Sequence, residues 1–139
     1  MNEKQPPVLV AEEALRGLGA VDAELEQRGA VSEGWFADWS DPFMGSDVYV
    51  GVMWASPTSP TARLLLDDWN IEELAVNDIG GVISCIFTGK ATMESRKSLF
   101  GRSRLLTLKI VLENSRYTAY RRVKIDDQIS PWEQNLITE

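Results

Sequence analysis

The sequence predicts an α+β domain in which one long N-terminal helix packs on an antiparallel β-meander of four to five strands. Two patterns favour this class. Near the N-terminus apolar residues recur every three or four positions, as in a helix, whereas in the last third they alternate with polar residues, as in strands. The chain has 139 residues, 44% of them apolar, so we expect residues 1–139 to form a single domain with its own core.

The N-terminal helix is predicted over residues 8–28. Two prolines precede it, where a missing backbone N–H is tolerated, and Gly29 suits its end. Gly17 and Gly19 each weaken such a helix by about 1 kcal/mol relative to alanine, so it needs tertiary packing. The apolar residues that share its buried face are Ala11, Ala14, Leu15, Leu18, Val21 and Leu25.

Residues 30–61 are predicted as an aromatic loop region that contains one strand. Turn-forming and aromatic residues are mixed here without a regular period, except in the apolar run 48–54, which suits a strand buried on both faces. Residues 62–76 fit a helical turn or a strand about equally well. We favour a strand that begins at Trp69 and ends at Val76.

An antiparallel meander is predicted over residues 69–125. Glycine, asparagine and aspartate are dense in residues 77–81, which we interpret as a hairpin connection into a strand over 82–94. A basic loop over 95–103 then leads to a strand over 104–113. Residues 126–139 form a C-terminal tail, predicted as a short docked segment.

The strand over 104–113 is expected to pair with residues 116–125 through a two-residue turn. That turn sets Leu108 opposite Arg121 and places Leu106, Leu108, Ile110 and Leu112 beneath the first helix. Arg121 then falls on the apolar face. We expect it to reach a carboxylate, to extend to the edge of the sheet or to mark a bulge.

Histidine is absent and Cys85 is the single cysteine, which excludes His-based triads, HExxH zinc sites, CxxC redox pairs and an intrachain disulfide. We therefore nominate no catalytic residue, no metal ligand and no cofactor; whether the chain is an enzyme stays open, and the sequence favours a protein that is not one. Asp38, Asp41 and Asp47 could offer oxygen ligands to a cation. Their spacing matches no EF-hand, and carboxylates in a turn-rich loop are more often solvated.

No signal-peptide core and no membrane-spanning segment are visible, which predicts a cytoplasmic protein.

Charge is divided unevenly along the chain. Residues 1–78 carry 4 basic and 15 acidic side chains, a net charge of −11, whereas residues 79–139 carry 10 basic and 6 acidic side chains, a net charge of +4. This asymmetry fits attraction within one chain, head-to-tail self-association, or an anionic ligand on the basic loop. The overall charge of −7 argues against a nucleic-acid partner.

Six residues are candidates for an interaction surface. Core packing accounts for most of the five tryptophans, but Trp35 and Trp39 lie in the aromatic loop region and are expected to make an exposed contact. The basic loop is expected to make salt-sensitive contacts, because exposed charges are screened within roughly 8–10 Å at physiological ionic strength. Its candidate residues are Arg96, Lys97, Arg102 and Arg104.

The order of predicted elements resembles two architectures at the level of fold: the globular heads of pilin-like subunits and the cone-shaped folds related to nuclear transport factor 2. A prepilin cleavage motif and a hydrophobic stem are absent, and the His/Asp pair usual in the cone fold cannot exist in a chain without histidine. Neither resemblance transfers a site residue, because fold alone does not carry function.

We expect a non-enzymatic interaction or assembly subunit that associates with a protein partner, or with itself, through opposed acidic and basic surfaces. The alternative is a small-molecule-binding or enzymatic domain of the cone-shaped α+β type, with an apolar pocket.

Overall fold

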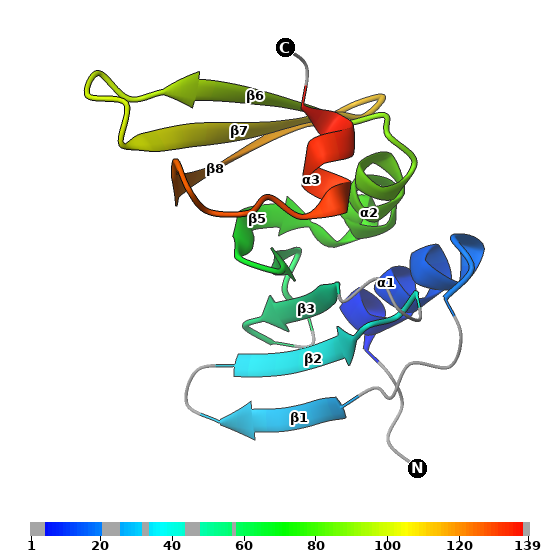
Figure 1. Ribbon diagram of the computed structural model, residues 1–139. Coiled ribbons are helices and arrows are strands. Elements are labelled where there is room, and N and C mark those ends of the chain that lie inside the picture. Colours follow the sequence, from blue (N-terminus) through cyan, green and yellow to red (C-terminus); the bar gives the residue numbers. More distant parts are fainter. Residues whose placement is uncertain (1–4, 21–25, 32–33, 44–47, 57, 138–139) are drawn as a thin grey trace. The chain divides into compact units, whose positions relative to one another are not determined.

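The computed structural model describes residues 5–20, 26–31, 34–43, 48–56 and 58–137 (Figure 1). The chain divides into two compact units, a first unit over residues 1–84 and a second unit over residues 85–139. Helices and two antiparallel sheets confirm the α+β class. The single domain expected from length stays a prediction. None of the helices in the described ranges is long and apolar enough to cross a bilayer.

The first unit contains a five-stranded antiparallel sheet in which neighbouring strands follow chain order. The aromatic region therefore holds more than the one strand that was predicted. Only the run at 48–54 was foreseen there, and it forms the third strand. The five strands are β1 (Glu26–Val31), β2 (Gly34–Ser40), β3 (Tyr49–Trp54), β4 (Thr61–Leu66) and β5 (Trp69–Ala75).

The core of the first unit lies on one face of this sheet. Trp39 pairs with Val50, and Val50 pairs with Leu66, so three buried side chains from successive strands form one row. Ala37, Val52 and Leu64 form the next row in the same way and are fully buried. Such rows of apolar side chains across antiparallel strands stabilise a sheet.

Helix α1 (Pro6–Gly17) packs against β3 and against the 3-10 turn η1 (Val76–Asp78). It has 12 residues, so the helix predicted over 8–28 is too long: 18–20 follow its end and 26–28 belong to β1, whereas 21–25 lie outside the described residues. The helix ends because Gly19 adopts φ +94°, a left-handed conformation that terminates helices, and the amide of Ala20 closes the end by donating to the carbonyl of Leu15 at 2.9 Å.

The turn η1 and helix α2 (Ile79–Phe87) replace the hairpin connection predicted at 77–81, and α2 also takes the first six residues of the strand predicted over 82–94, of which only 92–94 are in a strand. Its fully or nearly fully buried residues follow the helical spacing and are Ile79, Val82, Ile83 and Ile86. The helix ends before Gly89, which has φ +77°, and the amides of Lys90 and Ala91 both donate to the carbonyl of Cys85.

The second unit contains a three-stranded antiparallel sheet made of β6 (Thr92–Lys97), β7 (Ser103–Val111) and β8 (Arg116–Lys124). The last two strands confirm the hairpin expected near the C-terminus, but its register differs. A longer connection over 112–115 sets Leu108 opposite Ala119 and Leu106 opposite Arg121. The register moves by two residues, so every side chain keeps its predicted face. The meander predicted over 69–125 is wrong, because β5 belongs to the other sheet.

Helix α3 (Pro131–Leu136) packs against β6 and covers part of the sheet's apolar face (Figure 1). It occupies the tail that was predicted as a docked segment. Leu106, Leu108 and Ile110 are buried as predicted, at most 1% exposed, but the helix that packs on their sheet is α3 and not the N-terminal helix that was predicted; Leu112 follows β7 and is half-buried. Trp132 of α3 lies against Phe87, with ring centroids 6.1 Å apart.

Arg121 meets the expectation that it reaches a carboxylate. Its Nη2 lies 3.6 Å from Oε1 of Glu133 on α3, and the two side chains are 16% and 2% exposed. The same carboxylate oxygen accepts hydrogen bonds from the amide and the hydroxyl of Ser130, which precedes α3. One acidic side chain thus caps the helix and compensates an arginine on the apolar face of the sheet.

Candidate functional site

The basic loop predicted from the sequence forms the end of the β6–β7 hairpin. Lys97 pairs with Arg104 in the last row of the ladder, and residues 98–102 close the connection. The amide of Ser98 donates to the carbonyl of Ser103 at 2.8 Å, and the amide of Gly101 donates to the carbonyl of Ser98 at 3.0 Å. These bonds fix the backbone of the loop, so its side chains project from a defined position.

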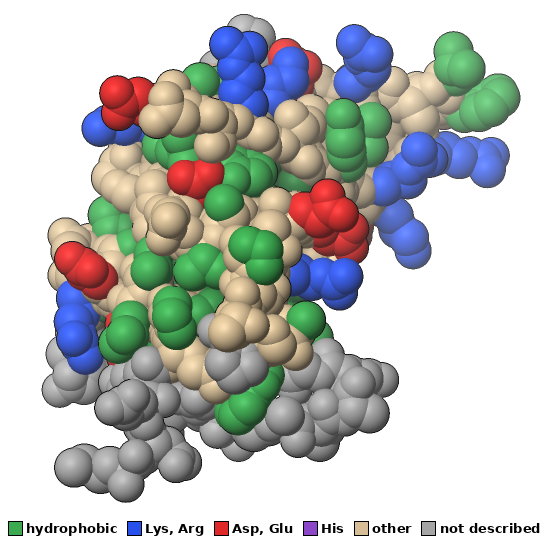
Figure 2. Space-filling view, turned by 180° about the vertical axis from the view of Figure 1, so that it is seen from behind, with side chains coloured by type: hydrophobic (Ala, Val, Ile, Leu, Met, Phe, Trp, Pro, Cys, Tyr) green, Lys and Arg blue, Asp and Glu red, His purple; other side chains and the backbone are tan. Residues whose placement is uncertain are grey.

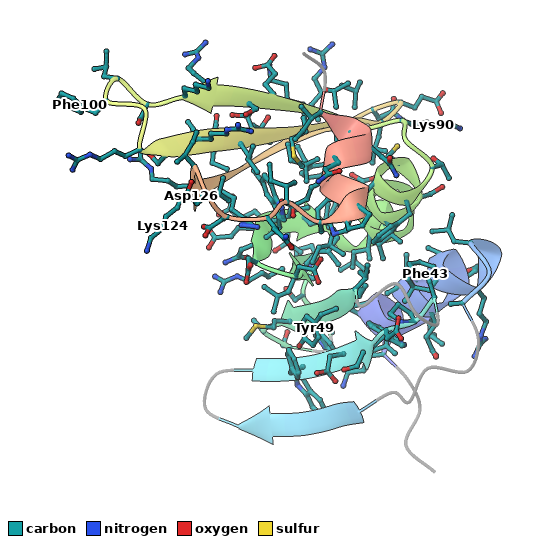
Figure 3. All side chains as sticks on the ribbon, in the orientation of Figure 1. Phe43, Tyr49, Lys90, Phe100, Lys124 and Asp126 are labelled. Carbon is teal, nitrogen blue, oxygen red and sulfur yellow. The ribbon has the colours of Figure 1, made fainter. Side chains whose placement is uncertain are left out.

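Two large apolar side chains stand at the apex of this loop. Leu99 is 99% exposed and Phe100 is 87% exposed, more than any other large apolar residue whose burial the structure describes. Figure 3 shows Phe100 at the far end of the hairpin, and Figure 2 shows apolar side chains projecting beside Lys and Arg side chains. We call Leu99 and Phe100 the hairpin tip. Adjacent exposed residues of this size indicate a contact surface, whereas single ones do not.

Basic side chains surround the hairpin tip on both faces of the sheet. Arg96 and Lys97 are neighbours on β6, so the alternation of a strand directs them to opposite faces. Arg102 lies in the loop and is exposed, and Arg104 on β7 is half-buried. We call these four residues the basic collar. The sequence named all four, and the structure brings them together within one hairpin.

The basic collar has no internal charge compensation. Within the described part of the chain, none of its four cations makes an ion pair, whereas Lys109 on the same hairpin pairs with Glu94 at 3.0 Å. The Nε of Arg104 is also buried without a hydrogen-bond partner among the described residues. Exposed cations without carboxylate neighbours are available to an acidic surface.

The glycine in the loop allows a prediction about hairpin stability. Gly101 has φ +68°, and a Cβ at this position would meet no atom within 4 Å, so alanine would be strained by its backbone rather than by a clash. Gly101→Ala is expected to lower the free energy of unfolding by about 1 kcal/mol. Urea denaturation would measure this change. In the control Gly17→Ala, at the end of α1, the same substitution should be neutral or stabilising. Equal effects at the two sites would contradict the account.

The outer face of the second sheet continues from the collar as a shallow groove of about 530 Å³. Arg96 belongs both to the basic collar and to the lining of this groove. Tyr120 on β8 also lines the groove, is 66% exposed and pairs with Thr107 on β7. The other residues that line it are Glu94, Ser95, Leu105 and Lys109. This face adds polar contact area beside the hairpin tip.

A second groove lies in the first unit, between α1 and the beginning of α2. It has a volume of about 430 Å³ and is lined mainly by small and apolar residues. From α1 and the residue after it come Val10, Glu13, Ala14, Gly17 and Leu18, and from α2 come Gly80, Gly81 and Ser84. We call it the α1–α2 groove. Both grooves are open to solvent, and the alternative hypothesis of a small-molecule pocket stays a prediction.

The two tryptophans nominated for an exposed contact belong to the first sheet. Trp39 is 2% exposed, so the prediction of an exposed contact at this residue is wrong. Trp35 is half-buried, and its ring stacks on that of Trp54 with centroids 6.5 Å apart and an interplanar angle of 12°. The reason is that 34–40 is a strand, whose alternation directs Trp35 and Trp39 to the same, core-facing side.

Of the three aspartates considered as cation ligands, the structure describes Asp38 and Asp41. The hydroxyl of Tyr49 donates to Asp38 at 3.0 Å, and Asp41 has φ +49° in the turn after β2, while Asp47 lies outside the described residues. Among the described residues, no three acidic, cysteine or histidine side chains are grouped so that they could hold a metal ion.

Comparison with known proteins adds no relative. No family model matches the chain, and neither a curated protein nor a solved structure is significantly similar to it. The functional inference therefore depends on the hairpin tip, the basic collar and the distribution of charge.

Proposed function

We propose that this chain is a non-enzymatic interaction subunit that assembles with further copies of itself through opposed acidic and basic surfaces. The observation that carries the proposal is the hairpin of the second unit, where an exposed apolar tip stands within a collar of cations that have no ion pair in the described part of the chain. An apolar centre surrounded by charged residues is the usual anatomy of a protein interface.

The charge boundary supports the same proposal. Residues 79–84 carry no charge, so the first unit keeps the net charge of −11 and the second unit keeps +4. The first unit is therefore acidic and the second unit basic in net charge. Surfaces of opposite sign accelerate encounter and select against wrong partners.

The proposal is tested by light scattering after size-exclusion chromatography at low and at high ionic strength. At low ionic strength the average molar mass is expected to exceed the 15.6 kDa of one chain, and at high ionic strength it should fall towards that value, because exposed charges are screened. A chain that elutes with the mass of a monomer under both conditions would overturn the proposal.

A matched pair of variants locates the contact. Arg96→Ser/Arg102→Ser is expected to weaken association by about tenfold, since each exposed ion pair contributes up to about 1 kcal/mol. Lys90→Ser/Arg116→Ser removes the same charge at the opposite end of the sheet, and Figure 3 shows Lys90 far along the sheet from Phe100. This control should weaken association much less. Equal effects of the two variants would remove the hairpin as the contact.

A further inference from the structure

The hairpin tip needs an apolar recess on its partner. Leu99 and Phe100 are large and almost fully exposed at the end of a narrow hairpin, a convex shape that buries little area against a flat surface. A recess that admits both side chains would remove most of their apolar surface from water, and such anchored side chains dominate the energy of interfaces.

The α1–α2 groove has the dimensions and lining of such a recess. Its volume of about 430 Å³ is open to solvent, so it offers an apolar surface against which both side chains can pack. A Cβ at Gly17 would meet no atom within 4 Å, which shows that the groove is open at this position. By contrast, a Cβ at Gly80 would lie 3.3 Å from Cγ1 of Val10, so the two helices approach closely there.

Charge favours the same pairing. Glu13 is exposed and lines the α1–α2 groove, and the unit around it has a net charge of −11. As the hairpin tip enters the groove, the basic collar would therefore approach Glu13 and a unit of opposite net charge. An anionic bilayer could also attract the collar, but it would repel the acidic first unit, so a second copy of the chain is the better partner.

We infer that the hairpin tip of one copy of this chain binds in the α1–α2 groove of a second copy, an inference that rests on the proposed function. The two surfaces differ, so the contact is head-to-tail. In a dimer of this kind one copy keeps a free tip and the other a free groove, so the assembly grows as a chain or closes as a ring.

Two variants separate the two halves of this contact. Leu99→Ser/Phe100→Ser removes the tip and keeps the groove, whereas Gly17→Arg fills the groove with a cation and keeps the tip. Each variant alone is expected to associate at least about 100-fold more weakly than the wild type, since interface anchors have effects of this size. Gly17→Ala is the matched control and should associate as the wild type does. Leu99, Phe100 and Gly17 are all exposed, so unchanged thermal unfolding should verify that each variant folds.

Mixing the two variants gives the decisive result. The tip variant supplies a groove and the groove variant supplies a tip, so an equimolar mixture is expected to form a one-to-one dimer with twice the 15.6 kDa of one chain. A mixture that stays monomeric while the wild type associates would overturn this inference and leave the proposed function standing. A wild type that is itself monomeric at low ionic strength would overturn both.

A vesicle-binding control distinguishes an anionic bilayer from a second copy of the chain as the partner of the hairpin tip. Sedimentation with vesicles of phosphatidylcholine and phosphatidylserine is expected to leave the chain in the supernatant at physiological ionic strength. Binding to these vesicles that is lost in Leu99→Ser/Phe100→Ser would overturn the inference, because it would assign the hairpin tip to an anionic bilayer rather than to a second copy.

Discussion

Replacing Glu133 by alanine is expected to lower the free energy of unfolding by about 3 kcal/mol. Glu133 is 2% exposed, pairs with Arg121 at 3.6 Å and accepts two hydrogen bonds from Ser130. The substitution removes a carboxylate that compensates an arginine on the apolar face of the sheet. It also removes the cap of α3, the helix that packs on β6. Urea denaturation followed by circular dichroism would measure the loss.

Two further variants assign the cause of that loss. Removing both charges, in Arg121→Met/Glu133→Leu, should restore stability to within about 1 kcal/mol of the wild type, because apolar residues of similar volume replace buried ion pairs at little cost. Ser130→Ala, which affects the cap alone, should cost about 1 kcal/mol. If Glu133→Ala changes stability by less than Ser130→Ala does, the ion pair contributes nothing and the explanation fails.

Leu108→Ala is expected to lower the free energy of unfolding by about 3 kcal/mol. Leu108 is fully buried at the centre of β7, between Met93 on β6 and Ala119 on β8, which are 0% and 4% exposed. Truncation removes apolar contacts from both sides and leaves a cavity that neighbouring strands cannot fill, because the ladder fixes their positions.

The neighbouring residue is the control for this variant. Lys109 lies on the opposite face of β7 and pairs with Glu94 at 3.0 Å, with the two side chains 47% and 58% exposed. Lys109→Ala should therefore cost at most about 1 kcal/mol. If chemical denaturation gave similar losses for the two substitutions, the buried face of the second sheet would have been assigned to the wrong residues.

The strands of the second sheet were predictable because their alternation is regular over a long span. Leu106, Leu108 and Ile110 identify one face of β7 without help from other elements. The register was not predictable to the residue, since turn residues alone did not show that the connection over 112–115 is longer than two residues. An error of two residues preserves every face, which is why Arg121 was still placed correctly.

The prediction of a turn and a strand over 79–87 was wrong because a short apolar run fits the period of a strand and the period of a helix equally well. Ile83, Cys85 and Phe87 alternate as in a strand, and Ile79, Val82, Ile83 and Ile86 recur as in a helix. The second pattern was present in the sequence and matches the residues that the structure buries. Two adjacent glycines, Gly80 and Gly81, are typical of a turn, but here they lie within a helix beside α1.

The predictions for the first helix and for the aromatic region were wrong for opposite reasons. The predicted helix continued past Gly19, although Gly19 itself ends α1 with φ +94°; Val21 and Leu25, which continue the apolar spacing, lie outside the described residues. In the aromatic region, Trp35, Ala37 and Trp39 alternate as in a strand, but the turn-forming residues around them concealed the pattern. Aromatic residues with a period of two indicate a half-buried strand more strongly than an exposed contact.

The candidate site was predictable in its charge and not in its apolar part. A run of cations with few carboxylates identified the basic collar directly. The hairpin tip could have been predicted from the sequence, because Leu99 and Phe100 are large apolar residues inside a polar, glycine-containing turn. The α1–α2 groove could not have been predicted from the sequence, because it depends on how two helices distant in the sequence pack together.

The central claim is that this chain associates through the end of its β6–β7 hairpin, and hydrogen exchange tests it most directly. Exchange is compared between dilute and concentrated protein at low ionic strength. We expect peptides that cover residues 98–102 and 10–18 to gain protection on concentration, while the opposite end of the sheet around Lys90 and Arg116 exchanges as before. Association without added protection in the hairpin loop would contradict the claim.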